Sequence, residues 1–436
     1  MKKYLHNLHE YSLYIFIFFL PWHTIYIIRE VFYATEKWQY GTIGIYISDI
    51  TLVIWIILSI YLYKDYILKR IFKKPHLLLV GLLLSLWSFV SIMWAADHVL
   101  AFYFTIKLSF ALDLFFLVQI IPLNIHKLSI TFFASVFIQS LIGIYQFTTQ
   151  NTFAQKFLGL QHHDVFSGGN AIVQTSGERW LRAYGGAPHP NIFGVILLAA
   201  LLFGLYILIK KKYSTLPTIL ALMGLSIITA NILYTFSRVT WLTSLLCIFT
   251  FTTFVHKSKK YNLKQLLPSL LLITLTALLV IGLSGNLFFK RISQDTVITH
   301  NSISDRALYI SQSKLLILSH PIIGTGIGNY TNTLKDESLP KRPLWQYQPV
   351  HNIYLLIISE IGFIGFILFA IFIIIILYTL YADKKNITLT QATFIIVFIG
   401  LLFISLFDHL AWTSHFGLLL LFLTAGLSLR DSLELN

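Results

Sequence analysis

The amino-acid sequence predicts an all-α integral membrane protein with about 12 transmembrane helices. Of its 436 residues, 56% are hydrophobic and only 11% are charged, which is about half the charged share of an ordinary soluble domain. Apolar runs of roughly 20 residues recur along the chain, and a helix of that length crosses a hydrocarbon layer about 30 Å thick. We therefore expect a single polytopic membrane domain over residues 1–436.

The expected spans follow these apolar runs in chain order. The first run, from about Tyr11, follows Lys2 and Lys3, but it is too long for the apolar core of a signal peptide and lacks a small-residue cleavage site. We therefore interpret it as a retained span. The expected spans are 11–29, 43–63, 77–95, 100–122, 128–148, 190–210, 214–235, 238–256, 265–286, 351–380, 389–407 and 414–430.

The basic residues lie mainly on one side of these spans. If the first end is cytoplasmic, the short outer connections hold few basic residues, which is the positive-inside pattern. This predicts that both termini are cytoplasmic, and it explains much of the formal net charge of +14 without a nucleic-acid partner. The basic residues expected on the cytoplasmic side are Lys2, Lys3, Lys64, Lys69, Arg70, Lys73, Lys74, Lys127, Lys210, Lys211, Lys212, Lys257, Lys259, Lys260, Lys264, Lys384, Lys385 and Arg430.

A few special residues lie inside the expected spans. Cys247 is the only cysteine, so neither an intrachain disulfide nor a cysteine-based metal site can form. Asp49 and Lys107 each lie about seven residues below the outer surface, and we expect them to form a neutralising pair. A proton path through these groups and Asp113 is the alternative interpretation.

Two long polar segments are expected on the outer side, at 149–189 and 287–350. We expect them to hold the function. The second contains a predicted interfacial helix at about 304–318, with Asp305 in its first turn, where a carboxylate suits the helix dipole. This helix is too short to span the membrane and carries Arg306 and Lys314, so it is expected to lie along the membrane plane.

Ionisable residues cluster at the expected outer ends of several spans. They are Arg179, Arg182, His189, Arg238 and His351. An arginine near the bilayer is costly without an anionic partner, and its guanidinium fork matches phosphate oxygens. Arginines from two outer turns would grip a diphosphate; the alternative is that each one reaches lipid phosphates or pairs with a nearby acid, such as Glu178 or Asp164.

His351 is the candidate general base. Imidazole titrates near neutral pH and can accept a proton from a sugar hydroxyl, although a histidine at a helix mouth is often only a solvated cap. Asn352 would orient either the ring or a substrate hydroxyl. Glu360 lies about 180° around the helix from His351, so it is a poor direct partner.

Two other patterns are interpreted as structural. The adjacent His162, His163 and Asp164 cannot all point at one ion from regular structure without strain, so we predict no metal there. The glycines of GTGIGNY at 324–330 resemble a nucleotide loop, but no strand precedes them and the segment is on the outer side. We expect a tight turn after Pro321.

The chain resembles the superfamily of O-antigen ligases and O-antigen polymerases, membrane glycosyltransferases of the C-type structural class. The ligase branch has a histidine followed by Asn, Ser or Gln, then nine residues, Gly, two residues and Gly, which matches His351, Asn352, Gly362 and Gly365. Similar landmarks occur in the same order in LRAYGGAPHPNIFG from Leu181, FSR at 236–238 and SDRALYISQSKLLILSHPIIGTGIGNY from Ser304. Together they cover about 180–375.

The resemblance implies a metal-independent, cofactor-free transferase in the plasma membrane with its site on the extracytoplasmic face. Its donor would be a glycan on a polyprenyl diphosphate, transferred en bloc with inversion to a glycan or lipid-glycan acceptor. By carry-over, Arg182 and Arg238 would hold the diphosphate and His351 would deprotonate the acceptor hydroxyl. His189, Asn191, Arg306 and Asn352 would be substrate-binding or supporting residues.

Two other functions remain open. A polysaccharide polymerase would use the same donor, but the pattern of arginine, ten residues and glycine, common in the outer loops of polymerases, is absent after Arg182, Arg291 and Arg306. A polysaccharide transporter or flippase would suit about 12 spans with buried charges. However, no matched pair of Gly/Pro-broken helices occurs in the two halves, and the polar residues are concentrated on one side.

Overall fold

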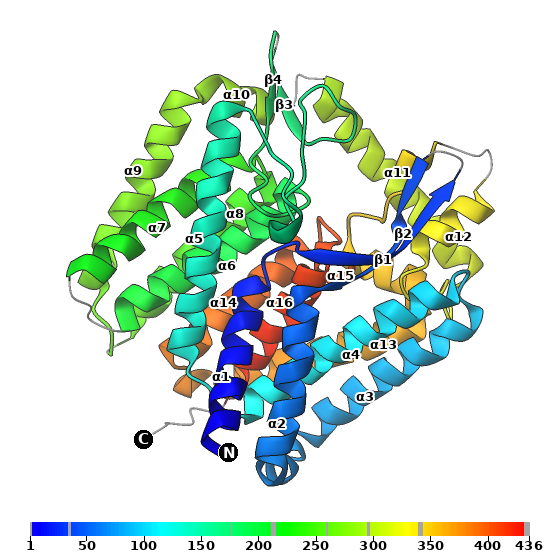
Figure 1. Ribbon diagram of the computed structural model, residues 1–436, viewed down its shortest axis with the longest axis horizontal. Coiled ribbons are helices and arrows are strands. Elements are labelled where there is room, and N and C mark those ends of the chain that lie inside the picture. Colours follow the sequence, from blue (N-terminus) through cyan, green and yellow to red (C-terminus); the bar gives the residue numbers. More distant parts are fainter. Residues whose placement is uncertain are drawn as a thin grey trace.

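The structure is a computed structural model that describes residues 2–33, 36–175, 177–210, 215–258, 260–293, 297–338 and 343–430. It is largely helical (Figure 1). The helices are α1 (Lys2–Phe19), α2 (Ile47–Ile71), α3 (Pro75–Val90), α4 (His98–Ile120), α5 (Ile125–Thr149), α6 (Pro190–Lys210), α7 (Thr215–Tyr234), α8 (Arg238–Lys257), α9 (Leu267–Leu283), α10 (Gly285–Ser293), α11 (Val297–Ser319), α12 (Tyr330–Glu337), α13 (Ile353–Ala382), α14 (Leu389–Ile404), α15 (Leu410–Thr413) and α16 (His415–Ser428). The strands are β1 (Ile25–Tyr33), β2 (Glu36–Tyr46), β3 (Ile172–Gln174) and β4 (Arg179–Leu181).

Fewer helices than expected are long and apolar enough to cross a membrane. Among the described residues, eight meet that test by length and composition. A ninth is obtained if α9 and α10, which meet at 86°, count as one broken span. The last two expected spans correspond to the shorter apolar helices α14 and α16. The chain is therefore a multi-pass membrane protein, and its described residues do not form the full set of about 12 regular spans.

The expected first span at 11–29 is wrong as a single helix. Helix α1 ends at Phe19, and β1 begins at Ile25. Pro21 lies between them; proline lacks a backbone N–H and disfavours helical conformation in the residue before it, which ends the helix there. The apolar stretch after Pro21 continues as a strand, because short apolar runs suit strands as well as helices.

The prediction of an all-α fold also needs a correction, because the chain forms two antiparallel hairpins. The longer one pairs β1 with β2, from Ile25 opposite Tyr46 to Tyr33 opposite Glu36. Arg29 on β1 forms a salt bridge with Asp97 at 2.7 Å, which ties this hairpin to the start of α4. The shorter hairpin pairs β3 with β4 inside the long polar segment at 149–189.

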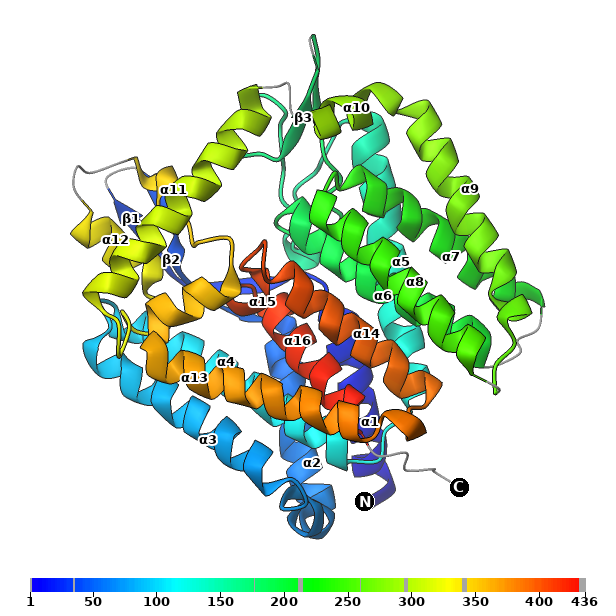
Figure 2. The ribbon, with the colours of Figure 1, turned by 180° about the vertical axis from the view of Figure 1, so that it is seen from behind.

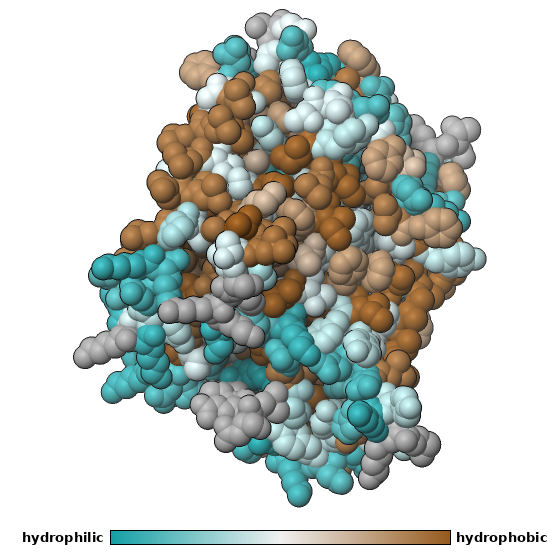
Figure 3. All heavy atoms as spheres, turned by 60° about the vertical axis from the view of Figure 1, so that its left-hand side comes forward, coloured by the Kyte–Doolittle hydropathy of each residue, from teal (hydrophilic) through white to brown (hydrophobic). Residues whose placement is uncertain are grey.

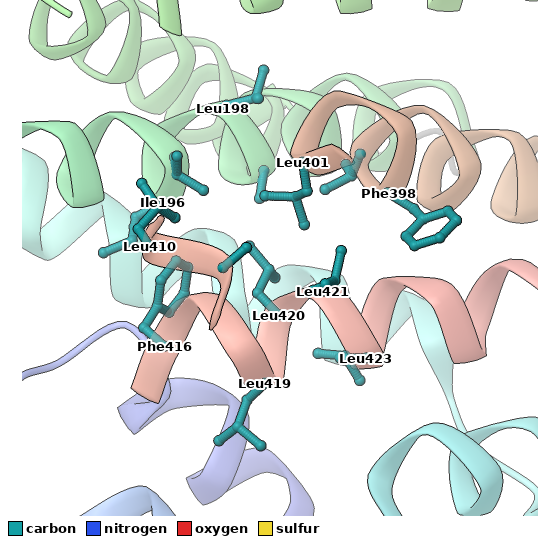
Figure 4. Close-up of a cluster of buried hydrophobic side chains, with 14 of the residues drawn as sticks. Ile196, Leu198, Phe398, Leu401, Leu410, Phe416, Leu419, Leu420, Leu421 and Leu423 are labelled. Atoms are coloured by element: carbon teal, nitrogen blue, oxygen red, sulfur yellow. The ribbon is translucent and has the colours of Figure 1, made fainter. Parts of the chain in front are cut away.

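The centre of the molecule is formed by α6, α14, α15 and α16. Nearly all of α6 is buried, including 89% of its most apolar stretch of 18 residues. Ile196 and Leu198 of α6 lie near Leu401 of α14 and Leu420 of α16 in one apolar cluster (Figure 4). Helices surrounded by other helices in this way hold their ends in fixed positions, which matters for the site at one end of α6.

The two ends of the bundle differ in character. The end of α2, the start of α3, and the ends of α4 and α16 meet around Lys73, Lys74 and Leu429. The starts of α6 and α13 and the helix α15 lie at the other end (Figure 2). On the face shown in Figure 3, hydrophobic side chains form a broad band between more hydrophilic ends. This pattern suits a bundle that crosses a hydrocarbon layer.

The predicted ion pair within the spans is confirmed. Lys107 on α4 donates to Asp49 on α2, and both side chains are buried. His415 at the start of α16 lies 3.5 Å from the second oxygen of Asp49 and stacks on Tyr46 at 4.1 Å. The pair therefore belongs to a polar contact that joins α2, α4 and α16.

The predicted interfacial helix is longer than expected. Helix α11 covers Val297–Ser319 and includes the whole of 304–318. It packs against α13 through a hydrogen bond between the hydroxyl groups of Ser313 and Ser359 (3.0 Å). This contact brings Arg306 and Tyr309, two turns and one turn earlier on α11, towards the residues that precede α13.

Candidate active site

His351 lies immediately before α13, and its neighbour Asn352 caps that helix. The side-chain oxygen of Asn352 accepts hydrogen bonds from the backbone N–H groups of Tyr354 and Leu355, each at 3.0 Å. Its amide nitrogen donates to the Leu406 carbonyl at 3.1 Å. Asn352 therefore fixes the start of α13 against the chain that leaves α14, a supporting contact to backbone groups.

The His351 ring lies between two other rings. Tyr309 of α11 stacks on it with a centroid separation of 5.6 Å and an interplanar angle of 12°. His409 meets it edge-on at 5.0 Å. Among the described residues, Nδ1 of His351 has no hydrogen-bond partner. Burial lowers the pKa of His351, which keeps the imidazole neutral and able to accept a proton at neutral pH.

Asp408 is a central residue of this site that the sequence analysis did not identify. One oxygen accepts from the backbone N–H of His409 at 2.8 Å, at the start of α15, and the other accepts from the side chain of Asn191 at 3.0 Å. Burial favours its neutral form, but electrostatic interactions with the imidazoles of His409 and His351 and the Asn191 hydrogen bond outweigh burial and lower the pKa of Asp408. The carboxylate is therefore ionised at neutral pH.

Arg182 joins the same network from the β4–α6 connection. Its Nη2 donates to the side-chain oxygen of Asn191 at 2.8 Å, and its Nε donates to the Thr235 carbonyl at 2.5 Å. Burial lowers the pKa of Arg182 to about 9, and Arg291 acts in the same direction, so the guanidinium stays charged at neutral pH. The side chain of Asn191 thus bridges Arg182 and Asp408.

Two further histidines face this network. Nδ1 of His189 accepts from the Asn191 backbone N–H at 3.1 Å. Burial lowers its pKa to about 3, and the charge of Arg182 acts in the same direction. His409 contacts the Thr413 hydroxyl at 2.6 Å, and burial lowers its pKa to about 4. Both rings are neutral at physiological pH and hold the polar groups in place.

Four arginines gather beside these residues. Arg182 interacts electrostatically with Arg291 and Arg306, and Arg238 interacts with the same two side chains. Nε of Arg291 donates to the Phe236 carbonyl at 3.0 Å, in the turn before α8. In the described part of the chain, none of the four forms a salt bridge with a carboxylate. We refer to Arg182, Arg238, Arg291 and Arg306 as the arginine cluster.

The acids proposed as alternative partners are engaged elsewhere. Glu178 accepts from the Trp180 indole at 2.8 Å, and Asp164 accepts from the Phe166 backbone N–H at 3.2 Å and the Ser167 hydroxyl at 3.2 Å. Arg179 points towards the Phe166 ring, with 5.8 Å to its centroid. Arg179 is exposed and is outside the network of Arg182.

The glycines of the sequence motif join two backbone segments. Gly362 breaks α13 at φ 68°, and the helix resumes with the Phe363 N–H donating to the Pro321 carbonyl at 2.9 Å. From the other side, the Gly326 N–H donates to the Glu360 carbonyl at 2.8 Å. The predicted turn after Pro321 is thus confirmed, and its role is to satisfy the broken turn of α13. Glu360 itself accepts from Trp412 at 2.8 Å and does not face His351.

The structure therefore places most of the predicted residues together and adds three. His351, Arg182, His189 and Asn191 share one network, while Arg238 and Arg306 belong to the arginine cluster around it. The added residues are Asp408, His409 and Arg291. Asp408 and His409 lie in a connection of the chain, 408–413, that carries no arginine or lysine, so the arginine pattern gave no reason to select it.

Comparison with known protein families gives a match in the second half of the chain. No curated protein matches the chain. The family described as O-antigen ligase matches residues 223–370, a region that includes Arg238, Arg291, Arg306 and His351 but not Arg182 or Asp408. Its coverage agrees with the motifs from 236 onwards. The match of residues 223–370 supports the resemblance of the chain to the O-antigen ligase superfamily.

Proposed function

We propose that this protein is a membrane glycosyltransferase that moves a glycan en bloc from a polyprenyl diphosphate to an acceptor hydroxyl on the outer face of the plasma membrane. The observation that carries the proposal is the arginine cluster: four cationic side chains that form no salt bridge with a carboxylate among the described residues, next to a neutral His351. Several positive charges that are buried or half-buried close together are costly without an anion, and a diphosphate supplies that anion.

The arginine cluster explains how the leaving group would be stabilised. As the bond between the anomeric carbon and the phosphate oxygen breaks, negative charge grows on the diphosphate. Guanidinium groups held in place before the reaction favour this charge more in the transition state than in the ground state. Arg182 is the best anchored of the four, through Asn191 and the Thr235 carbonyl.

His351 and Asp408 supply the acid–base part. The acceptor hydroxyl gives its proton to an imidazole nitrogen of His351 while its oxygen attacks the anomeric carbon from the side opposite the diphosphate, which inverts that carbon. The nearby carboxylate of Asp408 favours the protonated ring that results, because it raises the pKa of His351 against the effect of burial. Asp408 acts through His351 and is a positioning residue.

The test is glycan transfer by the purified protein in detergent. The donor is the host's polyprenyl-diphosphate-linked glycan, and the readout is release of free polyprenyl diphosphate together with labelled acceptor. We expect His351→Ala to reduce the rate by at least about 100-fold, the lower end for loss of a general base, with normal purification and unfolding temperature. His76→Ala, an exposed histidine at the opposite end of the bundle, is the matched control. A normal rate in His351→Ala would rule out this residue as the base.

A further inference from the structure

The first outer loop contains a second candidate site, separate from the arginine cluster. A cleft of about 620 Å³ lies beside the β3–β4 hairpin and is lined by Phe166, Trp180, Arg179, Glu178 and Gln174, among others. This hairpin protrudes from the end of the bundle that carries the candidate active site (Figure 1). We propose that the cleft binds sugar units of the transferred or accepting glycan, an inference that rests on the proposed function.

The side chains that line the cleft suit a carbohydrate. A sugar ring offers an apolar C–H face and a rim of hydroxyl groups, so it needs an aromatic surface with polar groups around it. Phe166 has 76% of its surface exposed, and Arg179 lies 5.8 Å from its centroid. Trp180 is oriented by its hydrogen bond to Glu178 at 2.8 Å. The exposed charges of Glu178 and Arg179 make lipid tails a poor occupant of this cleft.

The wall of the cleft lies close to the arginine cluster along the chain. Strand β4 carries Trp180 and leads into Arg182 two residues later, a distance of about 7 Å along an extended chain. Gln150 holds the intervening Leu181 through its backbone N–H (2.7 Å) and carbonyl (3.3 Å). A glycan whose diphosphate lies at Arg182 therefore has the cleft within reach of its sugars.

A chain of aromatic contacts supports the same placement. The Trp180 ring packs 5.8 Å from Phe147, and Phe147 packs 5.9 Å from Phe236. The Phe236 carbonyl accepts the hydrogen bond from Arg291. The cleft wall and the arginine cluster are thus parts of one packed unit, which would hold a bound glycan at a fixed distance from the diphosphate.

The first test measures binding without turnover. The probe is the free oligosaccharide released by mild acid from the host's polyprenyl-diphosphate lipids, titrated into the full-length protein in detergent and followed by saturation-transfer NMR. We expect Phe166→Ala and Trp180→Ala to weaken binding by about tenfold, the size of one aromatic contact. Phe157→Ala is the matched control, because Phe157 is equally exposed (79%) in the same loop but does not line the cleft.

The second test separates the possible sources of the sugar. If the donor glycan occupies the cleft, both variants raise the KM for a long-glycan donor about tenfold and leave the KM for a single-sugar donor unchanged. If the acceptor glycan occupies it, the KM for the acceptor rises instead. Either result supports the proposal. Unchanged binding and unchanged KM values in both cleft variants overturn it, even when transfer itself is normal. If the oligosaccharide binds in a Phe166-dependent way but the protein transfers no glycan, the proposed function is overturned and the proposal that the cleft binds sugar stands.

Discussion

At the scale of single residues, the site combines a neutral imidazole with an ionised carboxylate. Burial lowers the pKa of His351, whereas Asp408 raises it and becomes ionised itself. In the proposed mechanism the reactive form of His351 is the neutral one, so protonation of the ring would stop the reaction. The acid limb of activity should therefore follow the titration of this ring.

We expect the acid limb of kcat/KM for glycan transfer to have its midpoint below pH 6.5, the ordinary value for histidine. The rate should be constant above that midpoint up to about pH 8 and fall as the pH decreases through it. Asp408→Asn should move the midpoint further down, because it removes the charge that favours the protonated ring. A midpoint above pH 6.5 in the wild-type protein would contradict this assignment.

A second prediction at this scale concerns Asn352. Asn352→Ala removes two capping hydrogen bonds and the contact to Leu406, so we expect a loss of about 1–2 kcal/mol in the free energy of unfolding. The rate per folded molecule should stay within a few-fold of the wild-type value. Asn352→Ser keeps a capping oxygen and should recover most of the stability. Loss of transfer with unchanged stability would show that Asn352 contacts substrate instead.

Which residues the sequence could predict depended on whether they belong to a local pattern. His351, Asn352 and Gly362 occur together at fixed spacing, and Arg182, His189 and Asn191 occur within ten residues of each other. Asp408 contacts Asn191, which is 217 positions away in the chain. A single acidic residue before a short helix belongs to no local motif, so no pattern in the sequence indicated this contact. Its role follows only from the packing of α6 against α14.

At the scale of elements, the break in helix α13 fixes the position of His351, which lies just before this helix, relative to the turn after Pro321. The left-handed conformation of Gly362 leaves backbone groups on both sides of the break without helical partners, among them the Glu360 carbonyl and the Phe363 N–H, and the turn supplies their partners. A Cβ atom at this position would lie 2.1 Å from the Ile322 carbonyl oxygen. Only glycine fits both the conformation and the space.

We therefore expect Gly362→Ala to destabilise the protein by about 3 kcal/mol or more, as judged by thermal unfolding in detergent. Gly282→Ala on α9 is the control, because a Cβ there meets nothing within 4 Å. It should be neutral or stabilise by about 0.5–1 kcal/mol. Equal stability of both variants would mean that the break in α13 does not depend on glycine.

The ion pair between α2 and α4 offers another test at this scale. Lys107→Met leaves Asp49 buried without its cation and should cost about 3–5 kcal/mol. The double variant Asp49→Asn with Lys107→Met removes both charges and keeps an oxygen for the Tyr46 N–H that Asp49 now accepts. It should regain most of the stability and retain glycan transfer. A folded but inactive double variant would favour the proton path.

At the scale of the whole molecule, the lysine-rich helix ends and the candidate site lie at opposite ends of one bundle (Figures 1 and 2). The apolar runs predicted most of the long helices, because length and hydropathy suffice for a regular span. They could not predict the β1–β2 hairpin or the bend between α9 and α10, since length and hydropathy alone do not distinguish a short apolar strand or a bent pair of helices from a straight span. The number of spans was the part of the fold least determined by composition.

The central claim is that the arginine cluster holds the diphosphate and that His351 acts only in the chemical step. The most direct measurement is equilibrium binding of radiolabelled polyprenyl diphosphate to the purified wild-type protein and to Arg182→Ala, Arg238→Ala and His351→Ala, with Arg70→Ala at the opposite end as the control. We predict that each of the two cluster variants weakens binding by about tenfold or more, while His351→Ala binds normally and transfers glycan at least about 100-fold more slowly. Wild-type affinity in both cluster variants, or normal transfer by His351→Ala, would contradict the account.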